Sequence, residues 1–96
     1  MAKRANTYRL TLALQTLASG EAAPPRALEL TFDNHDELFT IIDRLRQQDP
    51  FGDPAQATEL AIGLKLFSEV MLKNRSHPLF EEFWPAFRLF LAKLKG

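Results

Sequence analysis

The chain has 96 residues, of which 46% are hydrophobic, and its 12 basic and 12 acidic residues give a formal net charge of zero. This length predicts a single domain over residues 1–96. The balanced charge argues against binding to nucleic acid through a general basic surface. The chain lacks cysteine, which excludes disulfides and thiolate metal sites. No signal peptide and no apolar run long enough to span a bilayer is recognised, so a cytoplasmic location is expected.

Two stretches near the N-terminus show the alternation that is typical of β-strands. In residues 8–15 and again in residues 27–32, apolar side chains occupy every second position, with polar or small residues between them. Residues 18–25 form a flexible connection that ends in two prolines. The pattern predicts an antiparallel hairpin with one apolar face and one face toward water.

Three amphipathic helices are predicted after the hairpin, over about residues 35–47, 54–73 and 78–94. Asn34 and Glu37 have the spacing of a capping box before the first helix. Asp53 and Pro54 mark the start of the second helix, and its apolar arc is broad enough for a central position in the fold. Gly63 lies in that arc, where we expect close approach of a neighbouring element. Pro85 is expected to bend or restart the third helix.

The predicted fold class is therefore α+β: an antiparallel β-hairpin followed by three helices that pack on one face of the hairpin, in the order ββααα. One core is expected to contain the apolar residues of both parts, namely Tyr8, Leu10, Leu12, Leu14, Leu28, Leu30, Phe32, Leu38, Ile42, Leu45, Leu60, Leu64, Phe67, Met71, Phe83 and Phe87.

The candidate binding surface is the polar junction between the second and third helices. It contains two cations, an amide and an imidazole, with one acidic residue a turn earlier: Lys73, Asn74, Arg75, His77 and Glu69. These groups are explained either by helix capping on both sides of a short turn or by recognition of a carboxylate or phosphate. The two histidines lack the ligand spacing of a metal site, so no metal, no cofactor and no catalytic residue is predicted.

The stretch from Gly63 to Phe80 resembles a bacterial family known as domain of unknown function 3861 (DUF3861). The segment Phe83-Trp-Pro-Ala-Phe87, the C-terminal residues 91–96, the N-terminal Tyr8-Arg-Leu and the Asn34-His-Asp-Glu37 segment are also similar. The resemblance thus spans nearly the whole chain. It implies a bacterial, cytoplasmic α+β domain with no assigned activity and no catalytic residues to transfer.

Two functional hypotheses follow from these patterns. The first is a non-catalytic protein-interaction or regulatory domain, because Ile62 and Leu89 are apolar residues on polar helix faces and a two-stranded sheet has open edges that would allow a homodimer. The alternative is a small-molecule or anion site, binding or enzymatic, at the junction that contains Glu69, Arg75 and His77. Nucleic acid and membrane partners are not expected.

Overall fold

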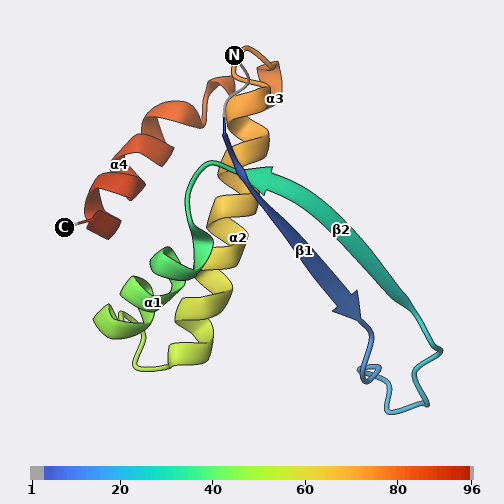
Figure 1. The fold of residues 1–96 in the computed structure, drawn as a ribbon. Coiled ribbons are helices and arrows are strands. Elements are labelled where there is room, and N and C mark those ends of the chain that lie inside the picture. Colours follow the sequence, from blue (N-terminus) through green and yellow to red (C-terminus); the bar gives the residue numbers. More distant parts are fainter. Residues whose placement is uncertain (1–3, 96) are drawn as a thin grey trace. The chain divides into compact units, whose positions relative to one another are not determined.

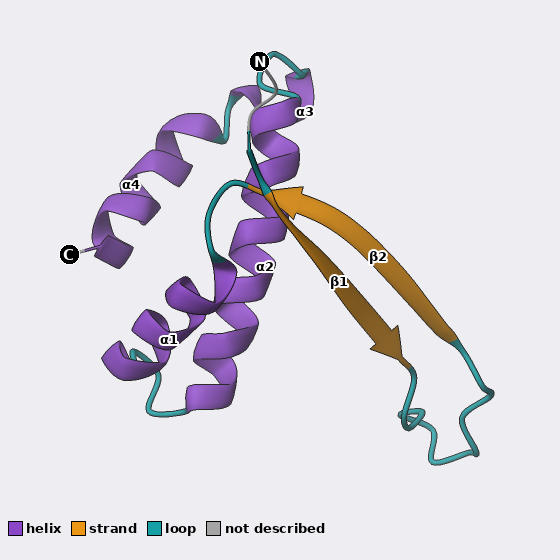
Figure 2. Cartoon of the chain, viewed as in Figure 1, coloured by secondary structure: helices purple, strands orange, loops and turns teal. Residues whose placement is uncertain are grey.

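The computed structural model describes residues 4–95. It confirms the α+β class, with an antiparallel hairpin followed by helices (Figure 1 and Figure 2). The elements are β1 (Asn6–Ala13), β2 (Ala27–Asn34), α1 (Leu38–Gln48), α2 (Pro54–Lys73), α3 (Pro78–Glu81) and α4 (Trp84–Lys95). The chain divides between Leu38 and Phe39 into two compact units, a hairpin unit and a helical unit. The single domain over residues 1–96 stays a prediction.

The hairpin pairs β1 with β2 in one continuous antiparallel register, from Asn6 opposite Asn34 to Ala13 opposite Ala27. Both strands differ from the expected ranges, because β1 begins and ends two residues earlier than 8–15 and β2 continues two residues beyond 32. The polar residues at the start of β1 and at the end of β2 extend the strand pairing, and a side-chain hydrogen bond supports it: the Thr7 hydroxyl donates to the Asp33 carboxylate at 2.9 Å.

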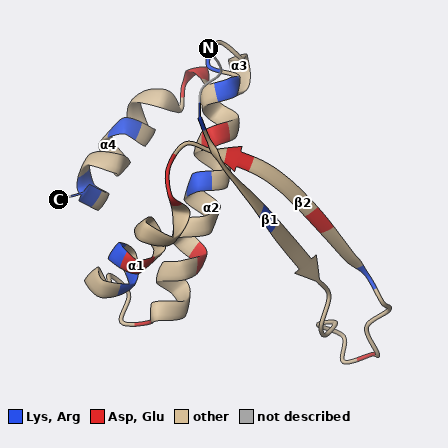
Figure 3. Ribbon diagram, viewed as in Figure 1, with Lys and Arg blue, Asp and Glu red and all other residues tan. Residues whose placement is uncertain are grey.

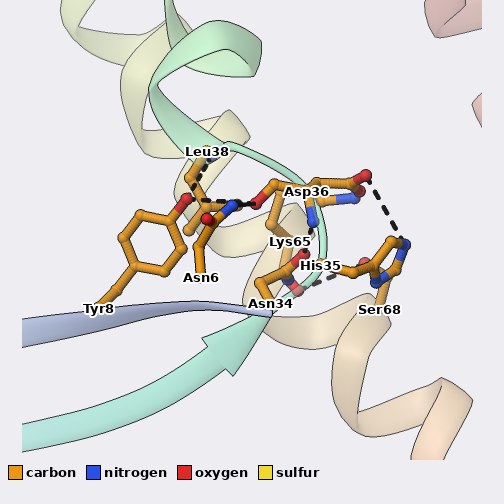
Figure 4. Close-up of polar contacts among 8 residues, drawn as sticks. All are labelled: Asn6, Tyr8, Asn34, His35, Asp36, Leu38, Lys65 and Ser68. Atoms are coloured by element: carbon orange, nitrogen blue, oxygen red, sulfur yellow. Dashed lines mark hydrogen bonds and ion pairs between the residues drawn. The ribbon is translucent and has the colours of Figure 1, made fainter. Parts of the chain in front are cut away.

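The start of α1 differs from the expected capping box. The Asn34 side-chain oxygen accepts from the backbone N–H of Asp36 rather than Glu37, which makes a tight turn, and the helix begins at Leu38 instead of residue 35. The backbone N–H of Leu38 donates to the Tyr8 hydroxyl at 2.9 Å (Figure 4). That hydroxyl donates to the Glu37 carboxylate at 2.9 Å. A tyrosine from β1 therefore satisfies a donor at the start of the helix, where the sequence predicted a local capping box of Asn34 and Glu37.

Helix α2 begins and ends as expected. The Asp53 side chain accepts from the backbone N–H of Ala55, and Pro54 occupies the first helical position. Asn74 ends the helix with a φ of −127°, outside the left-handed region that is common at helix ends. Its side-chain amide donates to the Val70 carbonyl at 2.8 Å and so satisfies one of the terminal carbonyl groups. The expectation for Gly63 is wrong: a Cβ there would meet nothing within 4 Å, so no neighbour approaches closely.

The third predicted helix, over 78–94, is two helices in the structure. His77 caps the short α3 by accepting from the Leu79 N–H, and the helix stops at Glu81. Helix α4 restarts at Trp84, with Pro85 as its second residue. Proline is tolerated there because the first backbone N–H groups of a helix have no intrahelical acceptor. The break therefore lies just before Pro85, so that the backbone N–H that proline lacks falls in the first turn of α4, where no intrahelical hydrogen bond is lost.

The helical unit contains two clusters of buried apolar residues, and α2 contributes to both. In the first, Leu45 of α1 packs with Ala57 and Ala61 of α2. In the second, Met71 of α2 packs with Phe80 and Phe87. Figure 1 shows α1 beside the first half of α2, in agreement with the first cluster. The central position expected for α2 within the helical part is thereby confirmed.

The expected single core is wrong for several of its members. Leucines of the hairpin and two phenylalanines of the helical unit are exposed to at least about two-fifths of their surface: Leu12, Leu14, Leu28, Leu30, Phe67 and Phe83. Phe67 still makes edge-on ring contacts with Phe80, Phe83 and Phe87. Two strands cannot shield their own apolar face, which accounts for the exposed leucines within the hairpin unit.

We predict that Leu45→Ala and Met71→Ala each lower the free energy of unfolding by about 2–5 kcal/mol, because both side chains are almost fully buried. Leu89→Ala is the matched control, since the Leu89 side chain is exposed, and its effect should stay within about 0.5 kcal/mol. Urea unfolding followed by circular dichroism measures all three. A loss at Met71 as small as that at Leu89 would contradict the second cluster.

Candidate functional site

The apolar face of the hairpin is the first candidate surface. In an antiparallel pair, directly opposed residues share a face, so the rungs Leu10–Leu30 and Leu12–Leu28 form one apolar strip. We call these four residues the leucine face. Leu12, Leu28 and Leu30 are exposed by 64%, 55% and 44%. The rung Tyr8–Phe32 continues the strip, with its rings stacked at a centroid distance of 5.6 Å.

The opposite face of the hairpin is polar, and its charges pair with one another. Arg9 of β1 lies 3.8 Å from the Glu29 carboxylate of β2, and the Thr11 hydroxyl lies 3.5 Å from the same carboxylate. Figure 3 shows the basic position on β1 and the acidic positions on β2. The two faces therefore differ sharply: one has cross-strand polar pairs, whereas the leucine face has no charged side chain.

A hollow of about 760 Å³ lies at the open end of the hairpin. Its walls come from both strand ends and from the connection between them, and the larger side chains are Leu12, Leu14, Gln15, Arg26 and Leu28. A backbone hydrogen bond from the Leu14 N–H to the Arg26 carbonyl, at 2.9 Å, holds the two sides together. The leucine face thus ends in a concave, mostly apolar region with one arginine beside it.

The predicted polar junction after α2 is the second candidate surface, and much of its polarity serves the turn. The side chains of Asn74 and His77 bond to the helix ends that they cap. The backbone N–H of His77 donates to the Asn74 carbonyl at 3.0 Å, and the Arg75 carbonyl accepts from the Trp84 indole at 3.3 Å. Capping and turn closure therefore account for two of the five predicted side chains.

The guanidinium of Arg75 has a different environment. It lies 5.6 Å from the centre of the Trp84 ring, and Arg88 lies 5.7 Å from the same ring. Among residues 4–95, neither arginine forms an ion pair with an acidic side chain. Sequence reasoning missed Trp84 and Arg88 as members of this corner, although their spacing of four on one helix could have indicated their contact. Lys73 is exposed and Glu69 is half-buried on α2.

The described part of the chain offers no arrangement for a metal. Residues 4–95 contain no group of three or more His, Cys, Asp or Glu side chains that could hold an ion. His35 lies in the turn before α1 rather than in the helix, 3.6 Å from the Asp36 carboxylate. Within the same residues, no helix is both long enough and apolar enough to cross a membrane.

Comparison with known proteins gives a family and one solved structure. Residues 6–96 match the family described as "Domain of Unknown Function with solved-structure structure" (DUF3861). A crystal structure of a protein of unknown function from Pectobacterium atrosepticum is 35% identical, with a TM-score of 0.82 over 96% of this chain and 98% of that chain. No curated protein matches. The family match covers nearly the whole chain, and the chain therefore belongs to the DUF3861 family, a family of unknown function.

Proposed function

We propose that the protein is a small, non-catalytic, cytoplasmic interaction module that binds a protein partner through the leucine face of its hairpin. The observation that carries the proposal is the exposure of Leu12, Leu28 and Leu30 on one uncharged strip. Isolated exposed leucines are common on protein surfaces, whereas a contiguous apolar strip beside polar pairs is typical of an interaction site.

Burial of these side chains supplies enough free energy to matter for binding. Complete burial of a leucine contributes about 1.5–3 kcal/mol, so two rungs of leucines can contribute several kcal/mol to association. The unpaired outer edges of a two-stranded sheet add backbone donors and acceptors for a partner strand. Apolar side chains bind but perform no acid–base or nucleophilic chemistry, so this surface favours recognition over catalysis.

Site-specific photo-cross-linking in cells tests this assignment. A photoreactive phenylalanine derivative at position 28 should give covalent adducts with a defined protein, because a side chain at this position projects from the leucine face toward the partner. The same group at position 29 is the matched control, since Glu29 is on the polar face one residue along β2. The proposal fails if position 28 gives no adduct, or if positions 28 and 29 give the same adducts at the same yield.

The second candidate function is anion recognition at the junction of α2 and α3, using Lys73, Arg75 and His77 with Glu69 and Asn74 nearby. The observation in its favour is that Arg75 and Arg88 share one indole and lack an acidic partner among residues 4–95. Guanidinium groups recognise carboxylates and phosphates through paired donors. The capping bonds of Asn74 and His77 would hold such a site in place.

For this candidate we predict that inorganic phosphate shifts the indole N–H resonance of Trp84 in a saturable way, and that Arg75→Ala with Arg88→Ala abolishes the shift. Arg44→Ala is a control for general charge, because Arg44 belongs to α1. A Trp84 shift that persists without both arginines, or that never saturates, rules out the site.

His77→Ala should lower the free energy of unfolding by about 0.5–2 kcal/mol, because the substitution removes the cap of α3.

A further inference from the structure

We propose that the partner of the leucine face is a second copy of this chain, packed face to face as a two-fold symmetric dimer. The inference rests on the proposed function, since it names the occupant of the same surface. It follows from the charge distribution, from the size of the exposed strip and from the hollow at its end.

Charge distribution favours an identical partner. A two-fold contact brings the same patch of both copies together, so a patch with charges of a single sign would face like charges. The four leucines of the leucine face carry no charge, and the charged residues within β1 and β2 lie on the other face, where Arg9 and Glu29 already pair. Arg26 lies beyond the strand, at the hollow. The formal net charge of zero also removes long-range repulsion between copies.

The same distribution disfavours the other symmetric arrangements of the hairpin. Antiparallel pairing of two β1 edges would bring Arg9 of both copies onto one shared polar face, and pairing of two β2 edges would do the same for Glu29 and Asp33. Pairing of β1 with β2 of the next copy would match the charges, but it is head-to-tail and therefore does not give a two-fold dimer. Face-to-face packing is the arrangement that closes without opposing like charges.

The size of the strip determines how strong the contact can be. The exposed fractions of Leu12, Leu28 and Leu30, together with that of Leu14 in the adjoining hollow, add up to about two fully exposed leucines for each copy. This places the contact at the small end of specific interfaces, below the area typical of permanent dimers. The dimer should therefore be reversible, with a dissociation constant above about 1 µM. The hollow of about 760 Å³ leaves space at the open end for side chains of the other copy.

Sedimentation velocity from about 10 µM to about 1 mM tests the dimer, a range set by the weak affinity expected for so small an interface. The full chain should shift from monomer to dimer across this range. Leu12→Ser with Leu28→Ser should weaken dimerisation at least tenfold, because these side chains are the most exposed of the strip. Thr11→Ser with Thr31→Ser is the matched control on the polar face of the same strands and should behave as the unchanged chain.

The salt dependence of the unchanged chain gives a second measurement if the serine variant unfolds. An apolar contact should keep its strength when sodium chloride rises about tenfold, whereas an ionic edge contact should weaken. A chain that stays monomeric at every concentration, a serine variant that still dimerises, or a dimer that dissociates in salt overturns the proposal. A monomer that still gives partner adducts from position 28 overturns only the second copy as occupant, whereas a monomer without adducts also overturns the proposed function.

Discussion

The register of one antiparallel strand pair determines how this protein presents its apolar residues. Side chains alternate between the two faces of a sheet, and opposed residues share a face, so pairing Leu10 with Leu30 places every second apolar residue on one side. A slip of one residue would mix leucines with Arg9 and Glu29. The sheet has two strands, and Leu12, Leu28 and Leu30 remain exposed on this side. The leucine face therefore follows directly from the register.

The same strand pair also organises the segment that follows it. Tyr8 and Phe32 form a stacked rung of the ladder, and the hydroxyl of that tyrosine accepts from the Leu38 N–H. The backbone between Asn34 and Leu38 is further held by the Asn34 side chain, which is almost fully buried. Since hydrogen bonds to buried groups are costly to lose, these contacts fix the exit from β2 and the point at which helical structure begins.

Sequence reasoning succeeded where the signal is local or periodic. The alternation in both strands, the Asp53 cap and Pro54 placed the hairpin and α2 closely. It failed where a distant residue decides the outcome. The start of α1 depends on Tyr8, thirty residues before Leu38, and no local pattern near Asn34 reveals that contact. Burial was predicted only in part: Leu45, Met71 and Phe87 are buried as expected, whereas Phe67 belongs to an apolar stripe yet remains substantially exposed.

At the polar junction between α2 and α3, local features were likewise predicted from the sequence and contacts with a distant residue were not. The polar residues after α2 were identified from their types, and capping explains Asn74 and His77 as a short turn requires. The guanidinium of Arg75 lies against the ring of Trp84, which is the first residue of α4, after the break in the third predicted helix. A break of this kind redirects every following side chain. The spacing of Trp84 and Arg88 could have indicated their contact, which the sequence analysis missed, but no spacing could have indicated the contact of Trp84 with Arg75.

The central claim is that the leucine face is open on a single chain and becomes covered by a partner. Methyl NMR of the leucines with a soluble paramagnetic agent tests this claim most directly, because the agent broadens only methyl groups that it can approach. In dilute solution the account predicts strong broadening for Leu12 and Leu28 and little for the buried Leu45. At high concentration the broadening of Leu12 and Leu28 should decrease. Equal protection of Leu12, Leu28 and Leu45 at every dilution would contradict the account, because the face would then be covered within its own chain.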